Sequence, residues 1–224
     1  MIESIPSRAT ILEGRQPLAR GAVRDIWERP GHPHQILKTI REHKRLKYAG
    51  KGSVSSAMDH LRFGPYGTFF IEYRCYMRTA YRCALVGRPI PIVEIGGLIL
   101  TDLGLAQVCE KISDPGGSLA PTLHDVIEEN ALTDERLNWL NDLIADLYAV
   151  NANVPDLKAK NIVLDQERER FVLVDGFGDK TLLPIRAWIA PLNRRQTEAR
   201  LRVIADRARL SWDQVAKRLM PNGT

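Results

Sequence analysis

Two short apolar runs, residues 162–164 and 171–174, are separated by a polar turn, and this arrangement constrains the fold more than any other stretch of the chain. Runs rich in β-branched and aromatic residues on either side of a polar turn are typical of antiparallel strands. Asn161 stands just before the first run, and Asp175 stands just after the second. Because neighbouring strands lie about 5 Å apart, the hairpin is expected to bring these two side chains close together.

The residues around this hairpin form a chemically coherent set. Asp156, Lys158, Asn161 and Asp175 supply an acid, a lysine, an amide and a second acid. Phosphoryl transfer from ATP uses these groups in this order: Asp156 would meet the acceptor hydroxyl, Lys158 would neutralise charge on the phosphoryl group, and Asn161 and Asp175 would bind Mg²⁺. The same groups would also allow transfer of AMP. The alternative is an ordinary hairpin in which the amide and the second acid only form turns.

The segment resembles the catalytic loop of the protein-kinase-like superfamily, and the chain resembles the YrbL family of the PhoP regulatory network. Four stretches carry the resemblance: Ala19–Trp27, Gly104–Leu123, Asp156–Leu164 and Val174–Lys180. The resemblance implies an α+β, compact two-lobed protein-kinase-like fold with a shortened C-lobe. Residues 1–108 would form an N-lobe of β-sheet and one helix. Residues 109–224 would form a mainly helical C-lobe with the catalytic loop and the metal-binding hairpin.

The resemblance also implies an ion pair that holds the nucleotide. Lys38 stands alone in the predicted apolar strand 35–40, where the kinase-like pattern places a lysine at the ATP phosphates. Glu72, on a helix predicted over 68–85, is its best partner. Two alternatives stay open: a surface lysine on an edge strand and an exposed helix acid.

Two further segments are expected to contact the nucleotide. Gly21 lies where a phosphate-covering loop is expected, and Arg24 would supply charge in place of missing glycines. Residues 108–112 match the hinge between lobes, where backbone groups around Glu110 and Ile112 would bind the adenine edge. Without the resemblance, this second segment is an ordinary strand ending in a loop.

The remaining pattern predicts ordinary elements. The basic run 41–51 is expected to be a solvated loop, or alternatively a site for an anionic partner. A capping-box-like sequence at Ser211–Gln214 predicts a last helix over 211–219. Apolar periodicity predicts strands at 17–27, 91–95, 98–101 and 105–109, and helices at 122–130, 133–150 and 194–209.

Three departures from an active protein kinase limit what the chain is expected to do. Gly21 is alone where the family pattern is glycine-rich, and Val154-Pro155 replaces the usual His-Arg before the catalytic acid. Only 49 of the 224 residues follow Asp175, too few for a peptide-binding groove. The sequence therefore favours an ATP- and Mg²⁺-dependent phosphotransferase acting on an unknown, non-peptide acceptor. The alternative is a non-catalytic kinase-like regulator that binds a nucleotide or a protein partner.

The composition limits the ligands and the cellular compartment that the sequence predicts. A formal net charge of +5 permits anionic ligands such as nucleotides but gives no strong nucleic-acid signal. No apolar run approaches the roughly 20 residues of a membrane span, and charged residues interrupt the first 20 positions where a signal peptide would need an apolar core. The three cysteines, Cys75, Cys83 and Cys109, have no metal-binding spacing. We therefore expect a cytoplasmic, reduced protein.

Overall fold

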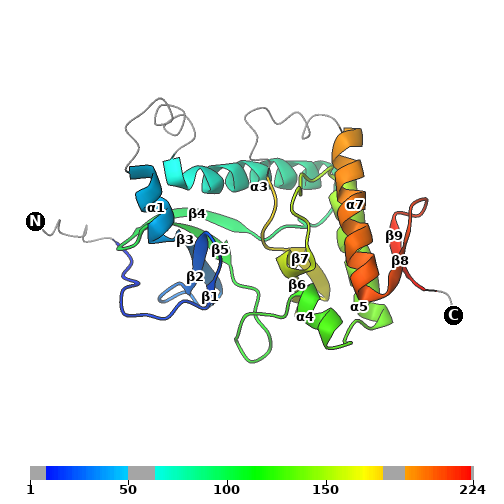
Figure 1. Ribbon diagram of the computed structural model, residues 1–224, viewed down its shortest axis with the longest axis horizontal. Coiled ribbons are helices and arrows are strands. Elements are labelled where there is room, and N and C mark those ends of the chain that lie inside the picture. The colour runs from blue at the N-terminus through cyan, green and yellow to red at the C-terminus, as the bar shows by residue number, and fades with distance from the viewer. Residues whose placement is uncertain (1–8, 50–63, 179–189, 223–224) are drawn as a thin grey trace, which may run out of the picture. The chain divides into compact units, whose positions relative to one another are not determined.

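The computed structural model describes residues 9–49, 64–178 and 190–222. The described residues form a mixed α+β structure with an antiparallel sheet and five α-helices, which confirms the predicted α+β class (Figure 1). The chain divides into two compact units, Met1–Tyr73 with Glu94–Lys111, and Arg74–Val93 with Ile112–Thr224. No helix in the described ranges is long and apolar enough to cross a membrane.

The first unit is built on a five-stranded antiparallel sheet with the strand order β1-β2-β3-β5-β4. Its strands are β1 (Ala19–Arg20), β2 (Arg24–Glu28), β3 (Gln35–Ile40), β4 (Ile95–Thr101) and β5 (Gly104–Glu110). The predicted strand at 35–40 is therefore confirmed. The predicted strand over 17–27 is interrupted by a turn at Gly21, because the chain reverses there to pair β1 with β2.

Strand register sorts the side chains of this sheet onto two unlike faces. Trp27 lies opposite Leu37, and Leu37 lies opposite Val108; with Leu12 and Ala106 these residues form a buried apolar cluster. The next row along each strand carries Lys38 opposite Gln107. Because successive side chains of a strand point to opposite faces, the polar row lies on the face away from the apolar cluster.

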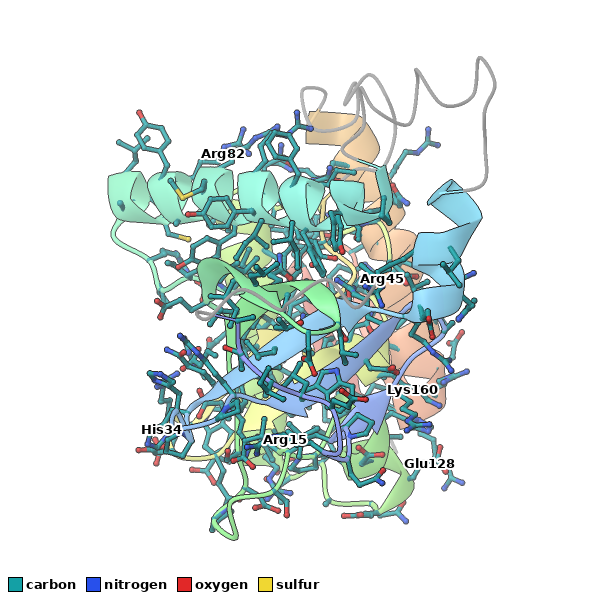
Figure 2. The ribbon with its side chains drawn as sticks, turned by 90° about the vertical axis from the view of Figure 1, so that its left-hand side faces the viewer. Arg15, His34, Arg45, Arg82, Glu128 and Lys160 are labelled. Carbon is teal, nitrogen blue, oxygen red and sulfur yellow. The ribbon has the colours of Figure 1, made fainter. Side chains whose placement is uncertain are left out.

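Two helices belong wholly or partly to this unit. Helix α1 (Glu42–Ala49) corrects the prediction of a loop over 41–51, whose last two residues lie outside the described ranges. Most residues of this helix, namely Glu, Lys, Arg, Leu and Ala, are good helix formers, and Glu42 lies in its first turn. Arg45 (Figure 2) lies near Tyr66 of the 3-10 turn η1 (Gly64–Tyr66), and their side chains occupy the space where a side chain at Gly104 would begin. Helix α3 (Gly67–Val86) confirms the helix predicted over 68–85 and contributes residues to both units.

The second unit contains two hairpins with helices packed against them (Figure 1). The elements are α4 (Leu123–Glu128), α5 (Asp134–Ala149), the 3-10 turn η2 (Ala159–Asn161), β6 (Ile162–Asp165), β7 (Arg170–Leu173), α7 (Ala190–Ala208), β8 (Leu210–Asp213) and β9 (Arg218–Pro221). Hairpin β6–β7 is the one that the sequence predicted. Its inner face packs against Ile112 and Ala120, so burial of apolar surface holds it in place.

The helix predicted over 211–219 is wrong, because this segment forms the β8–β9 hairpin. Asp213 accepts hydrogen bonds from the amides of Val215 and Ala216, which closes a turn instead of starting a helix. The side chain of Asn141 on α5 bonds both the amide and the carbonyl of Leu219, at 2.7 and 3.0 Å. Asn141 thus hydrogen-bonds to β9 in the way that the backbone of a neighbouring strand would. This tertiary interaction outweighs the local capping pattern.

Helix α4 begins with a capping box, and this feature predicts a pH-dependent stability. Thr122 donates its amide and hydroxyl to the Asp125 carboxylate at 2.9 and 2.7 Å, and these bonds lower the pKa of Asp125. The carboxylate therefore stabilises the fold above the unfolded-state pKa of about 3.9, and the contribution is lost as the pH falls through the lower folded-state pKa.

We expect Asp125→Asn to destabilise the protein by about 1 kcal/mol at pH 7, the usual scale of a cap interaction. The deficit should shrink between about pH 5 and pH 2, because the wild-type carboxylate itself becomes protonated there. Urea unfolding followed by circular dichroism at a series of pH values measures both quantities. A deficit that stays constant over this range would contradict the assignment.

Candidate functional site

The loop that precedes β6 and the turn that follows β7 meet at the open end of the hairpin. Ile162 pairs with Leu173, and the amide of Val174 donates to the carbonyl of Asn161 at 2.8 Å. The strand pairing thus continues to the residue before Asp175. As the sequence predicted, the hairpin places Asn161 and Asp175 beside each other.

Three hydrogen bonds then tie the acid loop, the amide and the second acid into one structure. Asn161 Nδ2 donates to the carbonyl of Asp156 at 2.9 Å, and the amide of Asp156 donates to the carbonyl of Gly176 at 3.2 Å. The amide of Gly176 donates to Oδ1 of Asp175 at 2.7 Å. Gly176 has φ +81° and lies so close to Asp156 and Asn161 that no Cβ fits there. The convergence of these groups depends on this glycine.

The orientation of the Asn161 amide has a chemical consequence. With its nitrogen bonded to the Asp156 carbonyl, the side-chain oxygen is the atom that remains able to ligate a cation. Together with the Asp175 carboxylate it offers the hard oxygen donors that Mg²⁺ prefers. The described residues contain no cluster of three or more His, Cys, Asp or Glu side chains. If Asn161 and Asp175 held Mg²⁺, phosphate and water would have to complete the coordination, as they do in nucleotide sites.

Asp156 and Lys158 form an ion pair at the edge of this structure. Lys158 Nζ lies 2.7 Å from Oδ1 of Asp156, and both side chains are about half exposed, at 55% and 47%. Such an exposed pair contributes little to stability. Its effect is to hold an ammonium group beside a carboxylate that solvent or a ligand can reach.

The segment that follows Asp175 is anchored in the interior of the second unit. Phe177 is buried, and the amide of Gly178 donates to the carbonyl of Asn153 at 2.9 Å. Val154, which with Pro155 is predicted to replace the usual His-Arg pair, is also buried. Apolar packing and this backbone bond therefore support the acid loop. Asp179 and Lys180, the end of the motif quoted above, lie outside the described ranges.

The first unit contains a second polar group, centred on Glu72. Arg24 Nη1 donates to both carboxylate oxygens of Glu72, at 2.7 and 2.8 Å, and the two side chains are only 14% and 4% exposed. Sequence reasoning assigned Arg24 to phosphate and chose Lys38 as the partner of Glu72, so it missed this ion pair. The alternation of β2 was the available signal, because it places Arg24 and Ile26 on the sheet face that also carries Lys38.

Lys38 belongs to the same polar face. Its residue exposure is 3%, and its neighbour across the strand, Gln107, is fully buried and donates to the Phe69 carbonyl of α3 at 3.5 Å. The alternatives of a surface lysine and an exposed helix acid are therefore excluded, since Glu72 is also buried. Within the described ranges, this face therefore carries the Arg24–Glu72 ion pair together with the buried Lys38.

The turn at Gly21 is tight and already uses its own amide. Gly21 N donates to the carbonyl of Arg24 at 2.8 Å, and Arg41 donates to the carbonyl of Gly21 at 3.1 Å. A phosphate at this turn would therefore meet charged side chains more readily than backbone amides.

The two predicted hinge residues are engaged within their own units. Glu110 N donates to the carbonyl of Glu94 at 3.0 Å, and the carbonyl of Ile112 accepts from Ala120 N at 3.0 Å. An adenine edge would have to use other backbone groups of this segment.

A comparison with models of protein families supports the predicted membership of the YrbL family. The sequence model of the family described as PhoP regulatory network protein YrbL matches residues 10–208, which is most of the chain. A search of curated proteins finds no significant match.

The glycine contact predicts a specific loss of stability. In Gly176→Ala, the new methyl group would lie about 2.5 Å from the Asp156 carbonyl oxygen and 2.7 Å from Asn161 Nδ2. We expect a loss of more than about 2 kcal/mol in the free energy of unfolding, measured by urea denaturation. Gly117→Ala is the matched control, because Gly117 has a similar φ of +83° with open space around it. Equal losses in the two variants would contradict the contact.

The buried ion pair predicts strong coupling between its partners. Arg24→Gln leaves a buried carboxylate without this partner and should cost about 3 kcal/mol. The double variant Arg24→Gln with Glu72→Gln should lose at least about 1 kcal/mol less than the sum of the single variants. Arg88→Gln, which breaks a more exposed pair with Asp146, should cost less than Arg24→Gln. Additive losses at residues 24 and 72 would show that the pair does not stabilise the fold.

Proposed function

Since the chain belongs to the YrbL family of PhoP regulatory network proteins, we propose that it serves a regulatory role as a kinase-like phosphotransferase that uses ATP and Mg²⁺. The acceptor is unknown, and a non-peptide molecule is the acceptor that we propose. In this proposal the fold is a compact two-lobed kinase-like one, with residues 1–108 as the N-lobe and 109–224 as the C-lobe.

One observation carries the proposal: Asp156, Asn161 and the Asp175-Gly176 turn are joined by hydrogen bonds at one end of a hairpin. An ordinary hairpin needs a turn at its closed end, but it needs no acid, amide and second acid at its open end. Here hydrogen bonds that involve the backbone hold an acid, an amide and a second acid close together. Their side-chain oxygens are the groups that phosphoryl transfer requires.

Each of these side chains has a distinct task in the proposed reaction. Mg²⁺-bound ATP supplies the phosphoryl group and the cation that neutralises its charge. The Asp156 carboxylate orients the acceptor hydroxyl and accepts its proton. Lys158, held 2.7 Å from that carboxylate, places positive charge where the phosphoryl oxygens would pass. Asn161 and Asp175 hold the cation through oxygen atoms.

The first unit would supply the nucleotide contacts. Lys38 would bind phosphate oxygens, and Glu72 would keep the local cations in place. Arg24 donates hydrogen bonds to both oxygens of that carboxylate, so its guanidinium group on β2 would contribute positive charge near the phosphates. Gly21 would let the β1–β2 turn approach the nucleotide, and the segment around Glu110 and Ile112 would receive the adenine. The three cysteines all lie within the described ranges and form no disulfide, which suits the reducing cytoplasm where ATP is found.

A second candidate function is a non-catalytic regulator with a kinase-like fold. Two observations favour it: Gly21 N is already bonded to the Arg24 carbonyl, and Arg24 itself is bonded to Glu72. Both contacts reduce the number of groups that can cradle a triphosphate. Such a protein would bind a nucleotide or a partner without transferring a phosphoryl group.

Thermal unfolding with Mg²⁺-ATP tests the nucleotide site directly. At a free ligand concentration of about 100 Kd, binding should stabilise the protein by about 2.7 kcal/mol. Asp175→Asn should abolish the Mg²⁺-dependent part of this shift, because it removes the charge of a proposed ligand. Asp213→Asn is the matched control, since Asp213 also accepts backbone amides in a turn but lies in the β8–β9 hairpin.

Asp156→Asn separates the two candidate functions. If the chain is a phosphotransferase, this variant should keep the Mg²⁺-ATP shift and lose at least about a hundredfold in ATP turnover or autophosphorylation, the usual scale of a general base. Binding without turnover in the wild-type protein would favour the non-catalytic regulator. No shift with any nucleotide would contradict both nucleotide-dependent proposals.

A further inference from the structure

Helix α3 exposes an apolar stripe in the part of the helix that belongs to the second unit. Met77, Tyr81 and Leu85 recur every four residues, so they lie above one another on one face. Their exposures are 53%, 65% and 67%. The opposite side of the helix is buried at Thr79 and Cys83. A helix packed on one side normally presents polar residues on the other, whereas the outer side of α3 includes this apolar stripe.

The helix is held so that this stripe faces outward. Arg82 on α3 (Figure 2) donates to the carbonyls of Val150 and Asn151, at 2.9 and 3.1 Å. Cys75 Sγ contacts the carbonyl of Asn153 at 3.8 Å. These contacts and the buried side chains all lie within the second unit. The apolar stripe is therefore a fixed feature of the surface.

A row of arginines runs along one flank of the stripe. Arg74, Arg78 and Arg82 also recur every four residues. Burial, followed by the nearby charges of Arg82 and Arg74, lowers the pKa of Arg78. Within the described ranges, neither Arg74 nor Arg78 forms an ion pair. The one acid of α3 is Glu72, which is buried. The exposed side of the helix therefore presents apolar groups and uncompensated positive charge.

We propose that this face of α3 is a docking surface for an acidic, amphipathic segment of a partner protein. Tyr, Met and Arg are the side chains that protein interfaces favour. Apolar side chains of the partner would cover Met77, Tyr81 and Leu85, and its carboxylates would pair with Arg74 and Arg78. The inference goes beyond the proposed phosphotransferase, because it needs no nucleotide.

Charge argues against two other occupants. A second copy of the chain docked α3 against α3 about a two-fold axis would oppose arginines with arginines, since the exposed part of the helix has no acid. A helix that lies on an anionic membrane surrounds its apolar face with cations, whereas the arginines here follow one flank. A protein segment with apolar residues beside a row of acids matches both the stripe and the single flank.

Photo-crosslinking in the native cells tests the proposal with the full chain. The photoreactive residue p-benzoylphenylalanine replaces Tyr81, and the control position is Val215, which is 94% exposed in the β8–β9 turn. We expect position 81 to crosslink an acidic peptide of another protein, identified by mass spectrometry. The pair Arg74→Glu with Arg78→Glu should reduce the yield by roughly tenfold. The pair Arg194→Glu with Arg195→Glu, on the exposed side of α7, should leave it unchanged.

The crosslinked segment then provides a defined ligand. As a synthetic peptide it should bind the purified protein, and Leu85→Ser should weaken its affinity by roughly tenfold while the circular dichroism spectrum and melting temperature remain those of a folded protein. Binding should also weaken as salt rises, because the arginine contacts are exposed. Crosslinks to lipid or to this chain itself would overturn the proposal. So would a yield no greater than at Val215, or a yield that ignores charge reversal at Arg74 and Arg78.

Discussion

The hydrogen bond from the Asn161 side chain to the Asp156 carbonyl is the interaction on which the rest of the candidate site depends. It fixes the acid loop against the hairpin, and it orients the amide so that its oxygen can serve a cation. Gly176 makes room for this bond, because any Cβ at that position would displace both partners. Burial of Phe177 and of the inner face of the β6–β7 hairpin then holds the arrangement in place. Packing thus positions a small polar group whose own bonds contribute little net stability.

The first unit buries charged and polar side chains. Glu72, Lys38 and Gln107 are all buried, and a buried charge destabilises the fold unless it is paired and hydrogen-bonded. Arg24 offsets part of this destabilisation by donating hydrogen bonds to both oxygens of the Glu72 carboxylate. The arrangement ties strand β2 to helix α3, so the polar face of the sheet is structurally constrained as well as charged. In the proposed function, this face would receive the phosphates of the nucleotide.

Helix α3 contributes residues to both units. One stretch carries Glu72 into the polar face of the first unit, and a later stretch packs through Thr79 and Cys83 in the second unit. Its exposed side combines an apolar stripe with a row of arginines, a pattern that local folding does not require. The sequence of α3 is apolar over much of its circumference because different stretches of the helix pack in different units. It also explains why periodicity alone predicted the helix but not the face that it leaves exposed.

The sequence by itself determined the elements whose signals are local: the β6–β7 hairpin, strand β3, helix α3, and the order of Asp156, Asn161 and Asp175 around a short turn. These follow from side-chain period and chain connectivity, which a sequence carries directly. Only the tertiary structure decided that residues 210–221 form a hairpin that Asn141 holds through hydrogen bonds, and that Arg24 pairs with Glu72. The physical reason is that each of these outcomes depends on a partner distant in sequence, whose burial and hydrogen bonds outweigh weak local preferences.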